Sequence, residues 1–350
     1  MTLEPALIRS VLEAGLRAPS AENKHFLRFE LGDKSFRLIA TDPSSAALPH
    51  RRWLASMSHG AVAENMVLRA SALGLGLEVR WVEPQPASGV VAEFHWGGTA
   101  PVDALASFID QRHTNRRFFN PAPLAAPVLT RLTEAASGAP GARMVWLTDA
   151  PRAAALRAIR IAETERFLRP RLHGEMFETI RFDGGWRGEA DEGLPLPALE
   201  VELPARAMFS AIRHWRVMRA MTLIGAHHAL GLRTGYLPAA LAPHVGVIVS
   251  DQARPGIPAD AAAGRALQRV WLAAAGAGVA FQPFASPTAL ARQRPGRDGW
   301  VSEGAHTRLG LLLNEVASDV RGAPQMFFRV GMANAPSGVT GRPAVERFIG

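Results

Sequence analysis

The chain has 350 residues, a formal net charge of +8 at pH 7 and no cysteine. Apolar residues make up 48% and charged residues 20%, so a sizeable core can form in one large domain or two modest ones. The missing cysteine excludes disulfides, thiolate metal sites and cysteine nucleophiles. The positive charge favours anionic ligands, but the Lys and Arg residues are scattered, so we expect no nucleic-acid partner.

Neither a secretory signal nor a membrane span is predicted. Charged residues interrupt the apolar pattern between Glu4 and Arg17 at the N-terminus. The long uncharged run from Val270 to Ala291 is cut by Pro283, and we interpret it as a buried helix followed by a turn. We therefore expect a cytoplasmic protein with no membrane partner.

The N-terminal part of the chain alternates between helical and strand-like patterns. Apolar residues recur at helical spacing from Glu4 to Ala18, and the helix is expected to end before Pro19. The loop that follows contains Ser20 and Asn23, which could simply cap it. The later patterns predict a hairpin with strands at 26–31 and 36–41, a long helix at 51–75, and strands at 77–82 and 90–96 joined by a link at Pro84–Pro86.

The rest of the chain contains one long stretch without any clear period. Residues 170–204 are rich in Gly, Pro and charge, and that length inside a compact protein indicates a functional lid or a disordered excursion. Gly296–Ser302 is expected to form an exposed loop, and the tail that follows carries Arg342. The other segments are predicted as helices at 124–137, 151–168, 205–232 and 260–278, and as strands at 144–147, 245–249 and 326–330.

The stretch Arg112–Phe119 is dense in cations. Four of its first six side chains can carry positive charge, Thr114 adds a hydroxyl, and apolar residues from Leu105 to Ile109 lead into it. Arginine presents a planar fork of donors that matches phosphate oxygens two at a time, so the stretch predicts a phosphate site. The alternative is a solvated turn between two helices, and the spacing alone does not separate the two.

Two nearly uncharged helices share residues at a constant offset. Each begins at a glycine, is rich in alanine and ends at a second glycine. We interpret them as a duplicated unit whose helices approach closely and form a pseudo-symmetric interface within one chain. The matching pairs, all separated by 204 positions, are Gly60 and Gly264, Leu68 and Leu272, Ala70 and Ala274, and Gly74 and Gly278.

Several of these segments resemble the flavin-dependent nitroreductases. Arg112-x-Thr114-x-Arg116-x-Phe118 resembles the Arg-x-Ser-x-Arg/Lys-x-Phe element near the start of that family. The loop Pro19–Asn23 resembles the family's Pro-Ser-Ser-x-Asn loop, and the two Gly-to-Gly helices resemble its central dimer helices. The Arg-His-Thr-Asn-Arg-Arg spelling looks most like the Acg-like branch, in which two nitroreductase units are fused in one polypeptide.

The resemblance implies an α+β, nitroreductase-like fold of two pseudo-symmetric units, with central helices and antiparallel or mixed sheets. We assign the first unit to residues 1–105 and the second to residues 106–350, with a lid insertion at 170–204. The chain would be a monomer with an internal pseudo-dimer, or a homodimer of it.

The resemblance also implies FMN as cofactor, NAD(P)H as electron donor and a nitroaromatic or quinone as small-molecule acceptor. Arg112 and Arg342 would hold the FMN phosphate, with Thr114 beside them. Arg116 would reach the N1/O2 edge of the flavin ring, where its charge would stabilise the reduced ring. The other implied cofactor-binding residues are His113 in the same motif, Pro19, Ser20 and Asn23 in the loop, and Gln282, Pro283 and Phe284 in a turn after the second central helix.

The loop after Asn23 departs from the family pattern, and other functions were considered for the chain. The family loop continues Gln-Pro-Trp where this chain has His25-Phe26-Leu27. A Rossmann glycine motif after a first strand, a P-loop and an H-E-x-x-H motif are all missing, and we expect no metal site. No acid or base stands out as catalytic, because the flavin would carry the chemistry. The alternative function is a flavin-binding or flavin-sequestering protein with little turnover.

We expect one flavin per chain. A symmetric dimer would have two sites, each built from an Arg-rich motif of one unit and a Pro-Ser-Asn loop of the other. The first half has the loop but no Arg-rich motif before its first helix. The second half has the motif, but its segment Ser137–Gly141 contains no Asn.

Overall fold

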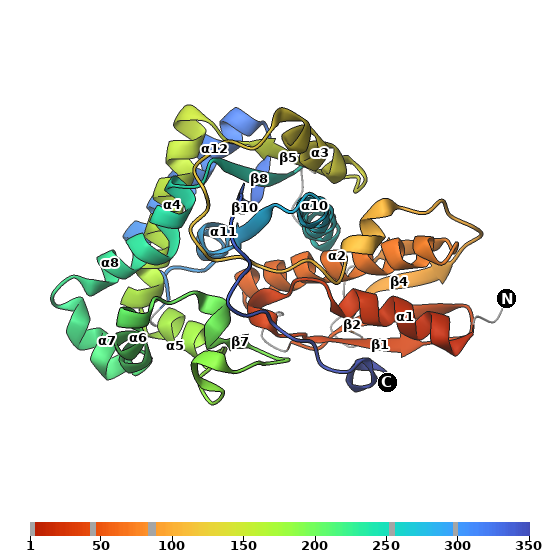
Figure 1. Cartoon of the computed structure of the whole chain (residues 1–350), viewed down its shortest axis with the longest axis horizontal. Helices are drawn as coiled ribbons and strands as arrows, with labels where there is room; N and C mark the ends of the chain where they lie inside the picture. Colours follow the sequence, from red (N-terminus) through yellow and green to blue (C-terminus); the bar gives the residue numbers. More distant parts are fainter. Residues whose placement is uncertain (1–3, 43–46, 83–88, 252–255, 297–299) are drawn as a thin grey trace.

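Two antiparallel four-stranded sheets each pack against one of two central helices in the computed structural model (Figure 1). The structure describes residues 4–42, 47–82, 89–251, 256–296 and 300–350. Helices and antiparallel sheets are both present, which confirms the predicted α+β class. No helix in these ranges is long and apolar enough to cross a membrane.

The first sheet is built from local hairpins. The predicted hairpin is confirmed, because β1 and β2 pair antiparallel from Leu27 with Ala40 to Leu31 with Phe36. The strand order is β1-β2-β4-β3, and the apolar face of this sheet packs on α1 and α2. The elements are α1 (Pro5–Leu16), the 3-10 turn η1 (Ala21–Asn23), β1 (Leu27–Leu31), β2 (Ser35–Ala40), α2 (Pro49–Ala72), β3 (Leu77–Trp81) and β4 (Val90–Trp96).

The second sheet has the order β5-β8-β10-β9 and brings together strands that are far apart in the sequence. Helix α10 packs on one face of it, while α4 and α12 cover the other. Its elements are η2 (Ala104–Phe108), α3 (Ala126–Ser137), β5 (Ala142–Trp146), α4 (Asp149–Leu168), β8 (His244–Ser250), α10 (Ile257–Gly276), β9 (Ala280–Phe284), α11 (Ser286–Ala291), α12 (Glu303–Val320) and β10 (Ala323–Gly331); the tail ends in η7 (Val345–Phe348).

A cluster of short elements joins α4 to β8 and forms a separate apolar group around Phe167, Phe177 and Ile212 (Figure 1). The prediction of one helix over 205–232 is wrong, since the segment breaks near His214 and again at Gly225, whose φ is +78°. Residues 170–204 also contain a regular helix that the sequence did not predict. The elements are α5 (Pro170–Glu178), β6 (Ile180–Arg181), η3 (Gly185–Arg187), β7 (Leu194–Pro195), η4 (Leu196–Leu199), η5 (Leu203–Ala205), α6 (Arg206–Ile212), α7 (Trp215–Thr222), α8 (Ala226–Gly231), the π-turn η6 (Leu232–Tyr236) and α9 (Leu237–Ala240).

Two predicted loops fall wholly or partly outside the described residues. The link at Pro84–Pro86 is one of them. In the other, Gly296–Ser302, residues 297–299 are not described, but Val301 is fully buried, so the expectation of an exposed loop is wrong there.

The central helices α2 and α10 touch where the predicted glycines lie. A Cβ at Gly60 would overlap the backbone of Ala261, and one at Gly264 would overlap the backbone of Met57. The two contacts are reciprocal, because Met57 and Ala261 are themselves separated by 204 positions. Glycine is required at both points because any side chain would push the helices apart.

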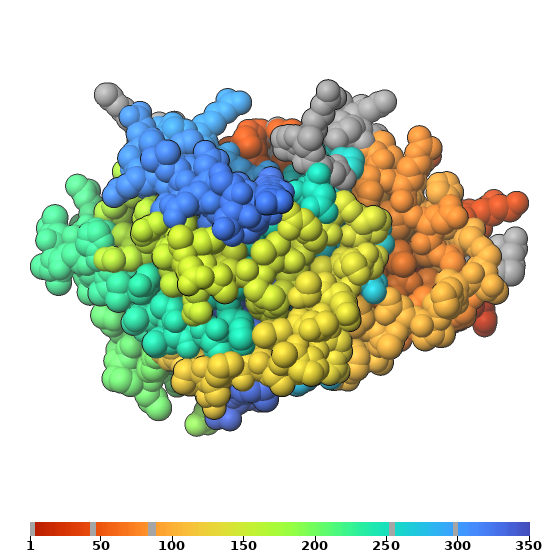
Figure 2. All heavy atoms as spheres, turned by 90° about the horizontal axis from the view of Figure 1, so that it is seen from above, coloured from red at the N-terminus to blue at the C-terminus, as the bar shows by residue number. Residues whose placement is uncertain are grey.

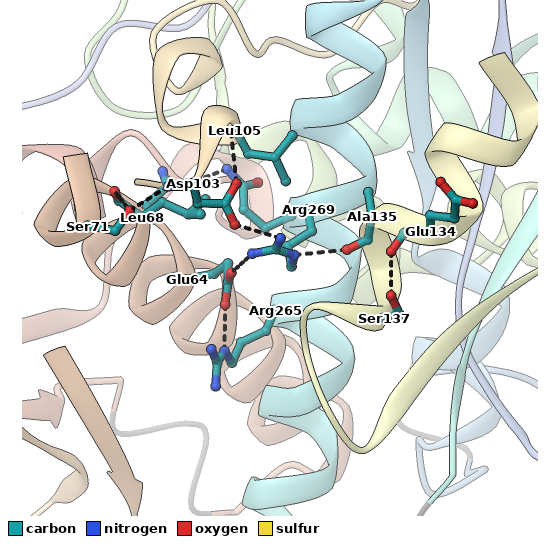
Figure 3. A network of polar contacts seen from close by, with 12 residues as sticks. Glu64, Leu68, Ser71, Asp103, Leu105, Glu134, Ala135, Ser137, Arg265 and Arg269 are labelled. Carbon is teal, nitrogen blue, oxygen red and sulfur yellow. Dashed lines mark hydrogen bonds and ion pairs between the residues drawn. The ribbon is translucent and has the colours of Figure 1, made fainter. Parts of the chain in front are cut away.

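A buried polar network extends along the same helix pair (Figure 3). Glu64 is fully buried and accepts from Arg265 at 2.6 Å and from Arg269 at 2.7 Å. Arg269 also reaches Asp103 at 2.7 Å and the carbonyl of Ala135 at 2.8 Å. A buried carboxylate is tolerated only when its charge is paired, so this network fixes how α2 and α10 align.

Candidate functional site

A cavity of about 480 Å³ lies between the N-terminal loop, α2, the Arg-rich stretch, the start of β10 and the cluster of short elements. Its size is within the range of cofactor and substrate pockets in proteins. All of the residues that the sequence singled out line it: Pro19, Ser20, Asn23, Arg112, His113, Thr114, Arg116, Gln282, Pro283, Phe284 and Arg342.

Arg112 is buried and stacks against an aromatic ring at the cavity wall. Its guanidinium lies 4.5 Å from the centroid of Trp271, and its Nη2 donates to the carbonyl of Arg17 at 3.1 Å. Its Nε is buried with no hydrogen-bond acceptor. Among the described residues, no carboxylate lies within ion-pairing distance of it. The guanidinium is therefore held in place without a neutralising partner.

Arg342 reaches the same region from the C-terminal tail. It donates to the carbonyls of Leu16 and Ala18 and to the side-chain oxygen of Asn23, at 2.7 to 3.2 Å. Burial, together with the charge of Arg17, lowers the pKa of Arg342 to about 10. Burial, together with the charge of Arg342, lowers the pKa of Arg112 well below its ordinary value. A buried cation and a partly buried cation that repel each other create a site for an anion.

Arg116 adds a third guanidinium, partly buried, which donates a hydrogen bond to the cluster of short elements. Its Nη1 donates to the carbonyl of Ala198 at 3.0 Å. Burial, with the charge of Arg166 acting in the same direction, lowers the pKa of Arg116 to about 10. Arg117, the next residue, differs: it lies 3.5 Å from Glu200 and does not line the cavity. Of these two neighbouring arginines, Arg117 therefore has a carboxylate beside it, whereas Arg116 has no ion pair among the described residues.

His113 and Thr114 lie between these arginines on an irregular segment. The carbonyl of His113 accepts from Trp271 Nε1 at 3.2 Å, which ties the segment to α10. Burial, together with the charge of Arg112, lowers the pKa of His113, so the ring favours its neutral form. The cation density of the motif thus comes from its arginines.

Asn23 uses its side chain to hold other segments of the protein. Its Nδ2 donates to the carbonyls of Asp191 and Gly193, at 2.9 and 3.1 Å, and its Oδ1 accepts from Arg342. Its backbone is left-handed, with φ of +55°, which asparagine tolerates better than most residues. In this arrangement the amide links the loop, the tail and residues 191–193. Ser20 lies 3.4 Å from His25 Nε2.

Gln282, Pro283 and Phe284 belong to strand β9, so the expectation of a turn at these residues is wrong. Pro283 is tolerated because β9 is an edge strand, where one backbone donor can be missing. Gln282 Oε1 accepts from Arg329 Nε at 2.8 Å, which fixes the amide against a fully buried guanidinium. The strand places all three residues along the cavity.

A second charged group lines the cavity and was not predicted. It joins residues from α2, α4 and α5: Arg51 contacts Glu175 at 2.7 Å, and Arg166 contacts Glu163 at 3.1 Å. Glu163 also accepts from Ser286 at 2.6 Å. The i, i+3 spacing of Glu163 and Arg166 was the available signal, but ion pairs at that spacing are common on solvated helices. These cations differ from Arg112 in being paired.

Part of the cavity wall is apolar and comes from the cluster of short elements, which also contributes Glu175, Glu200, Glu202 and Arg233 to the lining. Its lining side chains include Leu172, Met176, Leu199, Phe209 and Leu230. Several of them pack on the aromatic group around Phe177. The cavity therefore has a cationic end and an apolar wall, which suits a ligand with a phosphate and a flat ring system.

No protein-family model matches the chain. The chain is similar to the uncharacterized protein MT1398 of Mycobacterium tuberculosis, with 28% identity over 289 residues that cover 81% of this chain and 39% of that protein. The chain thus spans about two fifths of the length of the curated relative that it matches.

Solved structures with a similar arrangement include several FMN proteins. A nitroreductase with bound FMN from Desulfitobacterium hafniense matches 70% of this chain and 97% of its own, at 15% identity and a TM-score of 0.38. The FMN-dependent nitroreductase NfnB from Mycobacterium smegmatis, in complex with NADPH, matches 69% of this chain and 94% of its own, at 19% identity and a TM-score of 0.35.

Proposed function

We propose that this chain is an FMN-dependent oxidoreductase of nitroreductase type. The observation that supports this most directly is the presence of three arginines on one cavity, Arg112 buried and Arg116 and Arg342 partly buried, with no carboxylate within ion-pairing distance in the described part of the chain. A phosphate carries close to two negative charges near pH 7 and accepts several hydrogen bonds at once. FMN combines that group with a flat ring, and the apolar wall suits the ring.

In this proposal Arg112 and Arg342 hold the phosphate, and Thr114 contributes its hydroxyl. Arg116 is assigned to the N1/O2 edge of the ring, where a fixed positive charge stabilises negative charge. When bound, FMN supplies hydride transfer from NAD(P)H to a nitroaromatic or quinone acceptor. The apolar side chains around Phe209 exclude water from that region and select flat, apolar acceptors.

We further propose that the chain belongs to the Acg-like branch and arose by fusion of two nitroreductase units, residues 1–105 and 106–350. The reciprocal contacts of Gly60 and Gly264 support this idea. Two hydrogen-bonded pairs between the central helices support it as well. Glu64 pairs with Arg269, and Asn65 pairs with Gln268, so the two pairs join the same two positions of each helix, which are 204 residues apart. One complete set of predicted binding residues lines one cavity, so we propose one FMN per chain.

The test is reconstitution of the purified chain with excess FMN, followed by desalting and measurement of flavin absorbance against protein concentration. We expect about one flavin per chain and NAD(P)H-dependent reduction of a nitroaromatic compound or a quinone. Failure to retain flavin would reject the cofactor assignment, and a ratio near two would reject the single-site proposal.

A flavin-binding protein with little turnover is the second candidate. It is favoured by the bond between Arg116 and Ala198, because this bond holds the cluster of short elements against the cavity. Retention of FMN without reduction by NADH or NADPH would support this candidate over the enzyme.

A further inference from the structure

Residues 203–250 contain five arginines and no aspartate or glutamate. This segment runs from η5 through α6, α7, α8 and α9 to β8. In α7, Arg216 and Arg219 are exposed and have no ion pair within the described part of the chain. They are three positions apart on one helix and therefore point to the same side. The preceding segment, 170–202, carries eight Asp and Glu against three Arg, so the unpaired positive charge is local to α7.

The turn that follows α7 carries two bare aliphatic side chains. Leu223 is 87% exposed and Ile224 is 82% exposed, and they are the two most exposed large apolar residues of the described chain. Gly225 turns the backbone directly after them with φ of +78°, and nothing lies within 4 Å of the position of its missing Cβ. The turn therefore projects both side chains away from the protein.

The turn between α7 and α8 lies at one end of the longest axis of the molecule (Figure 1), at the left edge of the blue-green segment in Figure 2. The first sheet and the N-terminus lie at the other end. The tip therefore carries two exposed aliphatic residues that follow two exposed arginines of α7, and we call residues 216–224 the 216–224 tip.

We propose that the 216–224 tip docks the protein on the surface of a bilayer that contains anionic lipid. Leu223 and Ile224 enter the boundary between headgroups and acyl chains, and Arg216 and Arg219 contact the lipid phosphates. Apolar insertion combined with attraction to anionic lipid is how peripheral proteins bind reversibly. The earlier expectation of no membrane partner rested on the lack of a spanning segment, and surface docking needs none.

A bilayer fits the tip better than an acidic protein does. Protein interfaces have a broad, well-packed core that is enriched in aromatic residues. Here the exposed apolar surface is two adjacent aliphatic side chains on a projecting turn, with Val217 one helical turn or more away at 38% exposure. Two projecting side chains would bury little apolar area against a protein surface, whereas lipid molecules can surround them on all sides.

The experiment is co-sedimentation of the full-length chain with vesicles of phosphatidylcholine alone or with 30–40% phosphatidylglycerol (about that range, chosen to give a clearly negative surface). We expect binding to the anionic vesicles, and loss of that binding as salt rises and screens the arginines. R216E/R219E should weaken partitioning by roughly fivefold or more for each arginine, and L223S/I224S by on the order of tenfold.

Matched controls use exposed residues outside the 216–224 tip. V102S/L311S changes two apolar residues that are 68% and 65% exposed, and R80E/R308E alters charge by the same amount as the arginine variant. Both controls should bind vesicles like the parent chain. The proposal is overturned if the parent chain does not bind anionic vesicles at low salt, or if the control variants lose binding as much as the tip variants. FMN retention is measured in parallel, so this result is independent of the proposed cofactor.

Discussion

Replacing Arg112 with methionine should change stability and FMN binding in opposite directions. The guanidinium is buried against Trp271 and lacks a carboxylate partner among the described residues, so it costs free energy in the protein without ligand. Methionine fills a similar volume without charge. The same substitution removes a proposed contact to the FMN phosphate.

The contacts set the expected size of each effect. The variant loses one hydrogen bond to Arg17, about 1.5–3 kcal/mol for a charged donor, and a cation–π contact of about 0.5–2 kcal/mol. It gains the several kcal/mol that an uncompensated buried ion costs. We therefore expect the free energy of unfolding without ligand to be unchanged or raised by up to about 2 kcal/mol. Loss of one charged contact, about 1.5–3 kcal/mol, should weaken FMN binding by about 10- to 150-fold.

The assay compares FMN with riboflavin, which has the ring but no phosphate. Flavin fluorescence titrations should show weaker FMN binding to Arg112→Met and little change for riboflavin. Arg117→Met is the matched control, because Arg117 belongs to the same motif but lies beside Glu200 and does not itself line the cavity. Equal losses for both ligands, or unchanged FMN affinity, would refute the phosphate assignment. A large loss of stability without ligand would refute the view that the cation is uncompensated.

Three further changes test other parts of the structure. Asn23→Gly keeps the left-handed backbone but removes the side-chain hydrogen bonds to residues 191–193. Amide hydrogen exchange in that segment should accelerate, and the free energy of unfolding should fall by about 1–3 kcal/mol. Unchanged exchange would show that the Asn23 side chain does not hold this segment. Gly60→Ala should lower the free energy of unfolding by about 1–3 kcal/mol, because the added methyl group pushes the central helices apart. Gly310→Ala is the control: its methyl group meets no atom within 4 Å, and it should raise the free energy of unfolding by up to about 1 kcal/mol. Equal effects in denaturant unfolding would contradict the close approach of the helices. Burial lowers the pKa of His59 from 6.5 to about 4, so the unfolded chain binds this proton first as pH falls. The contribution of neutral His59 to the free energy of unfolding is fully present above pH 6.5. It declines by about 1.4 kcal/mol per pH unit toward pH 4, and His59→Gln should reduce this pH dependence in thermal melts. An unchanged slope would locate the acid sensitivity elsewhere.

Periodicity in the sequence was sufficient for elements stabilised by near neighbours. The hairpin of β1 and β2 and the helices α2 and α10 were predicted close to their observed bounds, because alternation and helical spacing record which face each segment buries. The offset of 204 positions also identified Gly60 and Gly264 as points of close approach. The family-like motifs named residues that all line one cavity.

Local pattern failed where distant segments decide the outcome. The helix predicted over 205–232 is broken, since its apolar residues serve a separate cluster with Phe167 and Phe177 that no local period records. The turn predicted at Gln282 is an edge strand, because β10 lies beside it and supplies the backbone partners. The helix α12 was missed, although Ser302 provides an N-cap by accepting from the backbone of Ala305.

The sequence by itself determined that the chain concentrates arginines in one motif and builds two glycine-marked helices. Only the tertiary structure decided which of those arginines remains without a carboxylate. Arg117 lies beside Glu200, whereas Arg112 lies against Trp271 and beside another cation, Arg342. A residue's charge is encoded locally, but its neutralisation depends on partners that packing brings from far along the chain, and on how much water that packing removes.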